Sequence, residues 1–307
     1  MHYAVTAFYK FVDLDDLTEI QAKLISKGEE LDIIGTILLA PEGINSTIAG
    51  EPDKLDAFMA FLRSLEPFRE LEEKRSEASE APFLRFKVRL KKEIVTIGIL
   101  EVDPRKEVGT YVEAEDWNSL IADPETILID TRNDYEVAIG KFEGAVDPMT
   151  PSFRDFPEWA RTHLEKKPDQ KIAMYCTGGI RCEKATSLLK HMGYDKVYHL
   201  KGGILKYLET IPEQESKWEG SCFVFDQRVG LEHGLAESPY DLCHGCRYPL
   251  TPEDREDPRF EEGVSCPKCA DTLDDDKKTR LRERHKQVQL ARRRGQVHIG
   301  SKARKAR

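Results

Sequence analysis

The spacing of apolar residues in the first hundred positions switches between strand and helix patterns. The pattern predicts a strand at 3–9, a helix at 14–28, strands at 32–40 and 47–50, a helix at 51–65 and a strand at 84–99. A turn at 41–46 separates the second strand from the third. Gly28 is expected to end the first helix, and Pro52 to open the second. This order predicts a ferredoxin-like (acylphosphatase-like) α+β domain over residues 1–100.

The last of these strands alternates strictly. Its apolar positions Phe86, Val88 and Leu90 are expected to face the core. The alternation sends a basic row to the opposite face, and the row consists of Lys87, Arg89 and Lys91. We take this row as a candidate RNA-binding surface; an ordinary solvated face is the alternative.

The pattern changes after a polar segment, 101–117, which we expect to be an extended linker. Compact apolar strands at 126–130, 171–176 and 196–200 then alternate with helical stretches at 154–167 and 183–194. Strands and helices in alternation predict an α/β domain with a parallel sheet, here over 118–216. Sites in such sheets lie beyond the carboxyl ends of the strands, which is where Asp130 and Cys176 fall.

The segment that follows the middle strand has the composition of an anion-binding loop. Cys176 ends the strand, a helix begins at Arg181, and the turn between them is Thr177, Gly178, Gly179 and Ile180. The glycines let the backbone curve so that its N–H groups point at the sulfur. Such donors at a helix start lower the pKa of a thiol. A buried structural cysteine would not explain both glycines and the arginine, so we predict that Cys176 is reactive.

Four further cysteines have the spacing of a metal site. They form two C-x₂-C pairs separated by nineteen residues: Cys243, Cys246, Cys266 and Cys269. Four thiolates in this pattern suit tetrahedral zinc, which would form a module over 217–275; the segment between the pairs has little apolar material, so the metal would supply its folding energy. Two free redox pairs are the alternative. We expect His244 to lie outside the ligand set and Cys222 to be a buried thiol.

Charge is distributed unevenly along the chain. The net charge is −9, but residues 277–307 carry thirteen lysines and arginines against one acid, Glu283, so the tail is +12 and residues 1–276 are −21. The tail, 276–307, is expected to be helical and to bind RNA phosphates, with Arg292, Arg293 and Arg294 as candidates. A solvated tail that only aids solubility is the alternative.

Composition also indicates the cellular compartment of the protein. No apolar run approaches bilayer length, and the first residues read as a strand followed by acids rather than as a secretory signal. We therefore expect a cytoplasmic protein with reduced cysteines and no membrane partner.

Three motifs resemble those of rhodanese domains, whose cysteine carries a persulfide sulfur. They are "DTRNDYEVAIGKFEGAVDP" from Asp130, "YCTGGIRCEKA" from Tyr175 and "LKGGILKYL" from Leu200. The four residues between Cys176 and Arg181 suit a single sulfur, whereas the related phosphatase loop has five. We take Asp130, Arg132 and Cys182 as candidate supporting residues; the resemblance is less clear about Cys182 than about Cys176. Lys141 stands where many rhodaneses have histidine, so it is given no catalytic role.

Nearly the whole chain resembles the bacterial tRNA uridine hydroxylases. The resemblance is carried by "LAPEGINSTIAG", "RFKVRLKKEIVTIG", "FRDFPEWA", "CEKA" and "CFVFDQRV". It implies oxygen-dependent conversion of the wobble uridine of tRNA to 5-hydroxyuridine, with molecular oxygen as co-substrate and Cys176 as the essential residue. The sequence does not decide between two roles for Cys176. It could carry a persulfide that takes part in the oxidation, or its thiolate could add to C6 of the base.

Three classes of function therefore compete. An RNA-modifying enzyme would use the amino-terminal domain, the zinc module and the tail to hold tRNA over Cys176. A plain sulfurtransferase would pass sulfur from a small molecule or a sulfur-donor protein and would not need the tail. A zinc-containing RNA-binding protein with an idle rhodanese fold is the third, and the intact "CTGGIR" argues against it. The sequence contains no evident organic cofactor motif and leaves the oligomeric state undetermined.

Overall fold

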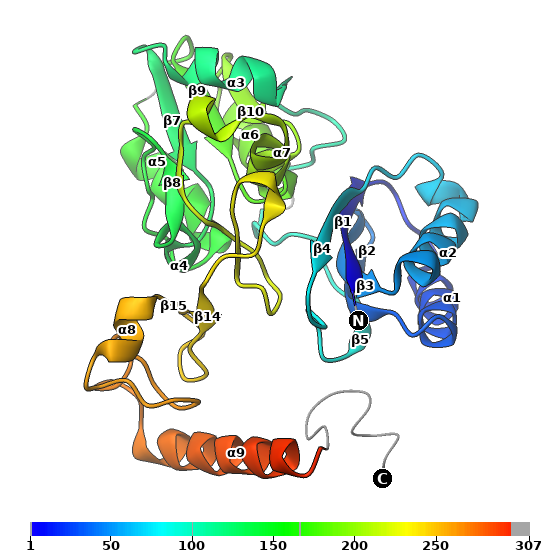
Figure 1. The fold of residues 1–307 in the computed structure, drawn as a ribbon. Helices are drawn as coiled ribbons and strands as arrows, with labels where there is room; N and C mark the ends of the chain where they lie inside the picture. Colours follow the sequence, from blue (N-terminus) through cyan, green and yellow to red (C-terminus); the bar gives the residue numbers. More distant parts are fainter. Residues whose placement is uncertain (1, 100, 166, 296–307) are drawn as a thin grey trace.

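The computed structural model describes residues 2–99, 101–165 and 167–295. Figure 1 shows an amino-terminal α+β unit, a central α/β unit and a smaller carboxyl-terminal unit that leads into one long helix. The α/β multidomain class predicted from the sequence is confirmed. No helix in the described ranges is both long and apolar enough to cross a membrane.

The amino-terminal unit has one five-stranded sheet with two helices on one face. Its elements are β1 (Tyr3–Phe11), α1 (Leu17–Glu30), β2 (Ile34–Ala40), β3 (Gly43–Gly50), α2 (Pro52–Ser64), the 3₁₀ turn η1 (Glu66–Phe68), β4 (Lys74–Ala78) and β5 (Phe86–Leu90). The strand order is β4-β1-β3-β2-β5. Strands β1 to β4 have the ferredoxin-like arrangement, and β5 is an added edge strand parallel to β2.

This arrangement corrects the sequence prediction for residues 84–99. That segment forms only the short strand β5, and the fourth ferredoxin strand is β4, which the sequence did not indicate. The chain leaves the sheet after β5 because its backbone bonds to side chains: the Ile94 N–H donates to Glu42 (2.7 Å), and the Ile97 N–H to Glu93 (3.1 Å). Leu90, expected in the core, is 41% exposed because β5 is an edge.

Two boundaries in this unit also differ from the prediction. Helix α1 continues through Gly28 to Glu30, because Gly28 packs inside the fold rather than capping the helix. A Cβ at Gly28 would lie 2.1 Å from the Phe86 ring, so glycine permits that close approach. The predicted turn at 41–46 is confined to Pro41 and Glu42, since β3 already begins at Gly43.

The central unit is a four-stranded parallel sheet with helices on both faces. Its elements are β6 (Thr110–Val112), α3 (Ala114–Ile121), β7 (Thr126–Asp130), α4 (Asp134–Val137), β8 (Gly140–Phe142), η2 (Phe153–Asp155), α5 (Phe156–His163), β9 (Lys171–Tyr175), α6 (Ile180–His191), β10 (Val197–Leu200), α7 (Gly203–Thr210) and η3 (Glu213–Glu215). The order is β6-β10-β9-β7. The predicted linker 101–117 therefore contains a strand of this sheet and the start of α3.

Each face of the parallel sheet has its own core. Phe156, Leu188 and Leu189 pack on one face, whereas Trp117 and Tyr207 pack on the other. Because both faces are covered, β7, β9 and β10 are largely apolar, and this explains why they were predicted from the sequence, whereas the exposed edge strand β6 was not.

The carboxyl-terminal segment first returns to the central unit and then leaves it. Its elements are β11 (Trp218–Gly220), β12 (Cys222–Phe223), β13 (Gly230–Leu231), η4 (His233–Leu235), β14 (Asp241–Leu242), β15 (Pro249–Leu250), α8 (Pro252–Glu256) and α9 (Asp275–Arg293). Strand β11 pairs with β8. The N-cap of α9 is Asp274, whose carboxylate accepts from the Lys277 N–H (2.7 Å), as expected of an acidic helix start.

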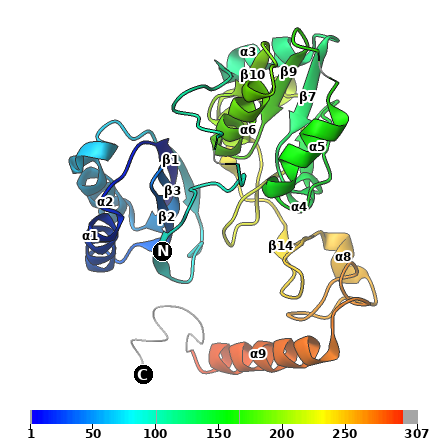
Figure 2. The same cartoon turned by 180° about the vertical axis from the view of Figure 1, so that it is seen from behind.

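The sheet face without helices points toward the central unit. Helices α1 and α2 lie on the far side of the amino-terminal sheet in both views (Figures 1 and 2). Helix α6 bridges the two units: the Tyr9 hydroxyl donates to Glu183 (2.7 Å), and the buried ammonium of Lys184 pairs with Glu42 (2.9 Å) and Glu93 (2.6 Å). The two units are therefore held in a defined relative position.

Candidate functional site

Cys176 lies immediately after β9, in a loop that is held by hydrogen bonds within the loop and from the start of α7. The N–H of Gly179, whose φ is +101°, donates to the Cys176 sulfur at 3.1 Å. The first residues of α7 hold the other side, since the Ile204 N–H donates to the Cys176 carbonyl at 3.0 Å. A Cβ at Gly203 would lie 2.5 Å from the same carbonyl oxygen, so a side chain there would displace the loop.

The surroundings of Cys176 favour a thiolate. Burial alone would raise the pKa of this thiol. A hydrogen bond from the Cys182 thiol, the positive charge of Arg181 and backbone N–H donors outweigh burial and lower the pKa to about 5. The sulfur is therefore ionised at neutral pH, as predicted for a cysteine at the centre of such a loop.

Cys182 is next to Cys176 but is held in the opposite protonation state. Burial and the neighbouring Cys176 charge both raise the pKa of Cys182 well above its ordinary value. Its sulfur also lies 3.5 Å from the Thr131 hydroxyl oxygen. The structure thus places Cys182 as a neutral donor toward Cys176, a position that the sequence left open.

Arg181 is turned toward a carboxylate that the sequence analysis missed. It makes a two-pronged ion pair with buried Glu136, at 2.5 and 2.8 Å, and its charge holds the pKa of that carboxyl below the usual range against the effect of burial. Thr177 also donates to Glu136, at 3.3 Å. Glu136 lies inside the quoted "DTRNDYE" motif, and its capping-box position relative to Asn133 was the available signal.

Asp130 and Arg132 stabilise the backbone near the site. They form a fully buried ion pair, with the shortest N···O distance 2.6 Å. Arg132 also donates to the carbonyls of Gly140 (2.6 Å) and Glu136 (3.2 Å), so the pair fixes the segment that carries Glu136. No contact recorded among the described residues joins either side chain to Cys176. Lys141 is exposed on β8.

A cavity of about 480 Å³ opens beside Cys176, between the central unit and the bare face of the amino-terminal sheet. The walls are supplied by three parts of the chain, including Cys176 and Thr177 from the loop, Tyr9 and Lys74 from the sheet, and Phe225 from the segment after β12. A site of this size is within the usual range for small-ligand pockets. The sequence could not reveal it, because its walls come from different folding units.

The basic row predicted on β5 adjoins this cavity. Lys87, Arg89 and Lys91 are exposed. Lys87 and Arg89 pair in register with Thr36 and Leu38 of β2, which line the cavity, so they lie on the same face of the sheet. RNA binding by this row stays a prediction.

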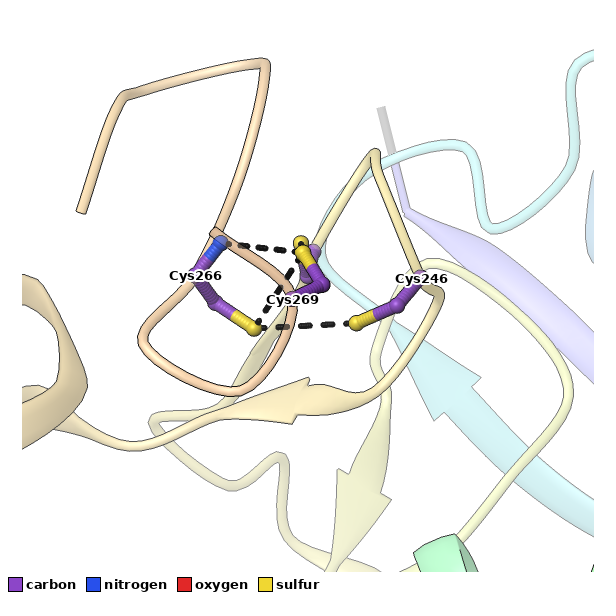
Figure 3. Close-up of side chains that lie close together, drawn as sticks. Cys246, Cys266 and Cys269 are labelled. Atoms are coloured by element: carbon purple, nitrogen blue, oxygen red, sulfur yellow. Dashed lines mark hydrogen bonds between the residues drawn. The ribbon is translucent and has the colours of Figure 1, made fainter. Parts of the chain in front are cut away.

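The four spaced cysteines come together in one cluster. Their sulfur atoms all lie within 4.8 Å of one another, and three of them are drawn in Figure 3. The closest S···S distances are 3.6 Å (Cys246–Cys266), 3.7 Å (Cys243–Cys269) and 3.9 Å (Cys266–Cys269). A tetrahedron with metal–sulfur bonds of about 2.3 Å has edges of about 3.8 Å, so the cluster fits a zinc ion. His244 is not part of the cluster.

The remaining predicted residues are placed as follows. Cys222 is a buried thiol, and burial raises its pKa to about 12. Arg292, Arg293 and Arg294 are exposed at the end of α9 and its cap. Residues 296–307 of the predicted tail lie outside the described residues.

Comparisons with known proteins agree with this architecture. The sequence model of the UPF0176 acylphosphatase like domain matches residues 3–94, and that of the Rhodanese-like domain matches residues 113–210. The chain is 58% identical over 301 residues to a tRNA uridine(34) hydroxylase of Rhizobium etli, covering 97% of each chain. It is 56% identical to a protein of the same name from Agrobacterium fabrum, covering 97% of this chain and 95% of the relative. The chain therefore belongs to the tRNA uridine(34) hydroxylase family.

Proposed function

We propose that this protein hydroxylates the wobble uridine of tRNA at C5, using molecular oxygen as co-substrate and Cys176 as the reactive residue. The observation that carries the proposal is a stabilised thiolate at the edge of an open cavity, in a chain whose relatives are named for this reaction. The name of those relatives favours hydroxylation over a plain sulfurtransferase. A sulfur-donor protein stays a prediction of that alternative.

The surroundings of Cys176 suit the chemistry that was expected from the sequence. A thiolate is the species that adds to C6 of a pyrimidine, and it is also the species that carries a persulfide sulfur. Both routes need an ionised Cys176, and Cys182, Arg181 and the Gly179 N–H all favour that form. In this proposal Asp130, Arg132 and Glu136 position the loop and do not touch the base.

The remaining parts of the chain have supporting roles in this proposal. The four-cysteine module holds a structural zinc ion, and Lys87, Arg89, Lys91 and the arginines of α9 bind tRNA phosphates. We also keep the domain limits proposed from the sequence, 1–100, 118–216, 217–275 and 276–307, as approximate folding units.

The test is mass spectrometry of nucleosides from tRNA of cells with the gene, without it, and with a Cys176→Ser variant. We expect 5-hydroxyuridine to disappear in the second and third strains. Binding of tRNA to the purified Cys176→Ser protein is expected to equal that of the wild type, because the sulfur lies behind the RNA-facing surfaces. Persistence of 5-hydroxyuridine in the strain with Cys176→Ser would refute the role of this residue.

A further inference from the structure

The bare face of the amino-terminal sheet forms the roof of the cavity over Cys176. Alternate residues of four strands point from it toward the cavity: Val5, Ala7 and Tyr9 of β1, Thr36 and Leu38 of β2, Asn45 and Thr47 of β3, and Lys74 and Ser76 of β4. The opposite face packs on α1 and α2. Most of these side chains are small, so the sheet leaves room for a ligand instead of filling the space with its own core.

An exposed aromatic ring stands at the wall of this cavity. Phe225 is 60% exposed, which is unusual for a large apolar side chain next to a reactive residue. Its ring lies 5.9 Å from the guanidinium carbon of Arg181 and 5.3 Å, edge to face, from the ring of Phe223.

The position of Phe225 is fixed by its neighbours in the chain. Asp226 and Arg228 form a buried ion pair, and Arg228 donates to the Ser76 hydroxyl (2.7 Å) and the Glu77 carbonyl (3.1 Å) of β4. The Val224 N–H donates to the Val229 carbonyl at 2.8 Å. The Thr177 hydroxyl donates to the Phe223 carbonyl at 3.5 Å, so the backbone around Phe225 is tied to both folding units.

Lys74 brings a positive charge into the same cavity, near the negative charges of Cys176, Glu72 and Glu183 but in direct contact with none of them among the described residues. No hydrogen bond or ion pair of its ammonium is recorded among the residues described, and the Nζ atom lies 5.2 Å from the centre of the Tyr9 ring. Its stem runs beside Gly202, since a Cβ there would be 3.5 Å from the Lys74 Cε. Burial lowers the pKa of Lys74, and the Cys176 charge opposes this effect. An ammonium group with no recorded hydrogen-bond acceptor in such a place indicates a ligand with an acceptor oxygen.

We propose that this cavity receives the wobble uridine, with its base stacked on Phe225 and its O4 oxygen bound by the ammonium group of Lys74. The proposal rests on the proposed function and names the residues that select the base. Proteins read single-stranded loop nucleotides by stacking them on exposed aromatic rings, and Phe225 provides such a ring.

The choice of O4 follows from where the reaction occurs. C5 and C6 of the base must approach Cys176, and O4 is attached to the ring atom next to C5, whereas O2 lies across the ring. A donor close to Cys176 therefore meets O4. Cytidine has an amino group in that place, which cannot accept a hydrogen bond from an ammonium, so Lys74 would select uridine over cytidine.

The experiment uses the full-length protein and synthetic anticodon stem–loop RNAs that carry uridine, cytidine or an abasic residue at position 34. Affinity is measured by fluorescence anisotropy at one fixed salt concentration. We expect Phe225→Ala to weaken binding of the uridine RNA about 10-fold and to leave the abasic RNA unaffected, because one stacked base is lost. Phe225→Trp should restore affinity for the uridine RNA.

Lys74→Met should also weaken the uridine RNA about 10-fold, and it should abolish the preference of the protein for uridine over cytidine. Two controls are matched in type: Leu90→Ala removes another exposed apolar side chain, and Lys23→Met removes another lysine, on α1 behind the sheet. Both controls are expected to bind all three RNAs as the wild type does.

Two results would overturn this inference. One is an equal loss of affinity for the uridine and abasic RNAs in the Phe225→Ala protein. The other is an equal loss of affinity for the uridine and cytidine RNAs in the Lys74→Met protein. Unchanged affinities in both variants would do the same, and neither outcome affects the proposed function. The proposed function fails separately, if 5-hydroxyuridine persists in tRNA from cells that lack the gene.

Discussion

At the scale of single residues, Cys176 and Cys182 show how two identical groups in contact acquire opposite states. The pKa of Cys176 is lowered to about 5, whereas that of Cys182 is raised well above its ordinary value. One shared hydrogen bond explains much of the difference, because Cys182 donates and Cys176 accepts. Cys182 thus acts on the reaction through its neighbour and is a positioning residue in our proposal.

The first residue-scale prediction concerns the pH dependence of Cys176. In the wild type, alkylation by iodoacetamide should stay fast as the pH is lowered and should fall only near pH 5, where the thiolate is protonated. Cys182→Ala removes a donor to the thiolate, so the pKa of Cys176 rises and the profile should move to higher pH. Cys182→Ser keeps a donor and is expected to retain at least part of the activity.

Measured alkylation rates across pH decide this prediction. A wild-type profile that coincides with that of Cys182→Ala would show that the hydrogen bond does not set the pKa of Cys176. Complete loss of 5-hydroxyuridine in both Cys176→Ser and Cys182→Ser cells would instead indicate a redox partnership between the two thiols.

The sequence predicted the reactive loop but not its surroundings, and the reason is physical. Cys176 to Arg181 are contiguous, so their residue types report one local backbone shape. Glu136 and Lys74 reach the site from distant segments: the capping-box position of Glu136 reports a helix start but not its pairing with Arg181, and a single lysine in a polar stretch carries no local signal. Long-range packing brought them there, and one sequence cannot show it.

At the scale of elements, the two outer strands of the amino-terminal sheet show where pattern reasoning fails. Strand β4 reads "KRSEA" and has only Ala78 fully buried, because one face of an outer strand meets the cavity and solvent. Strand β5 alternates clearly but is an addition to the ferredoxin-like order. Strong alternation identified a strand correctly, yet it did not reveal the neighbour with which that strand pairs.

The element-scale prediction concerns α6 and its lysine. Lys184→Met should lower the free energy of unfolding by about 3 kcal/mol, because Glu42 and Glu93 would lose the cation that compensates their desolvation. Urea unfolding followed by fluorescence measures the change. Lys190→Met is the matched control on the same helix: Lys190 is half-buried and donates to the Asp195 carbonyl (2.8 Å) rather than to a carboxylate, so its loss should have a much smaller effect.

The same ion pair predicts a pH dependence. Burial would raise the pKa of Glu93, but Lys184 lowers it below the ordinary value. The contribution of the pair is therefore present at neutral pH and is lost as the pH falls below about 4.5. The difference between wild type and Lys184→Met should narrow in that range; a constant difference would assign the effect to packing alone.

At the scale of the whole molecule, the chain joins an acidic body to a basic carboxyl terminus, with the cysteine cluster between them. Among the described residues, the hydrophobic cluster of this module joins Cys243, Cys266 and Cys269 to Leu250 and partly buried Phe260, so the module has little core of its own. In our proposal, metal coordination supplies the stability that this small core lacks. Both whole-molecule predictions follow from this arrangement.

The first is that the protein binds one zinc ion per chain through Cys243, Cys246, Cys266 and Cys269. Elemental analysis of protein purified without chelators should find about one equivalent. Cys246→Ser should lower that value and should make the segment after Leu242 sensitive to proteases. Full resistance to proteases without metal would contradict the structural role of zinc.

The second is that removal of residues 277–307 weakens tRNA binding and flattens its dependence on salt. Each lost phosphate contact should reduce the slope of log K against log salt by about 0.7 to 0.9, because fewer counterions are released. Filter binding at several salt concentrations measures both quantities. An unchanged slope would assign binding to the basic row on β5 and to other surfaces.

The walls of the cavity over Cys176 come from chain segments on both sides of residues 105–107. The chain can therefore be divided there into two fragments that each carry part of the cavity. Cutting the chain at the exposed residues 105–107 would remove no wall of the cavity. In the intact chain the linker holds the amino-terminal sheet near the central unit at a high effective concentration. After the cut, the amino-terminal fragment must find the central unit by diffusion. Activity of the two mixed halves should therefore rise with their concentration and saturate, as in subunit complementation, whereas the intact chain should show constant activity per molecule.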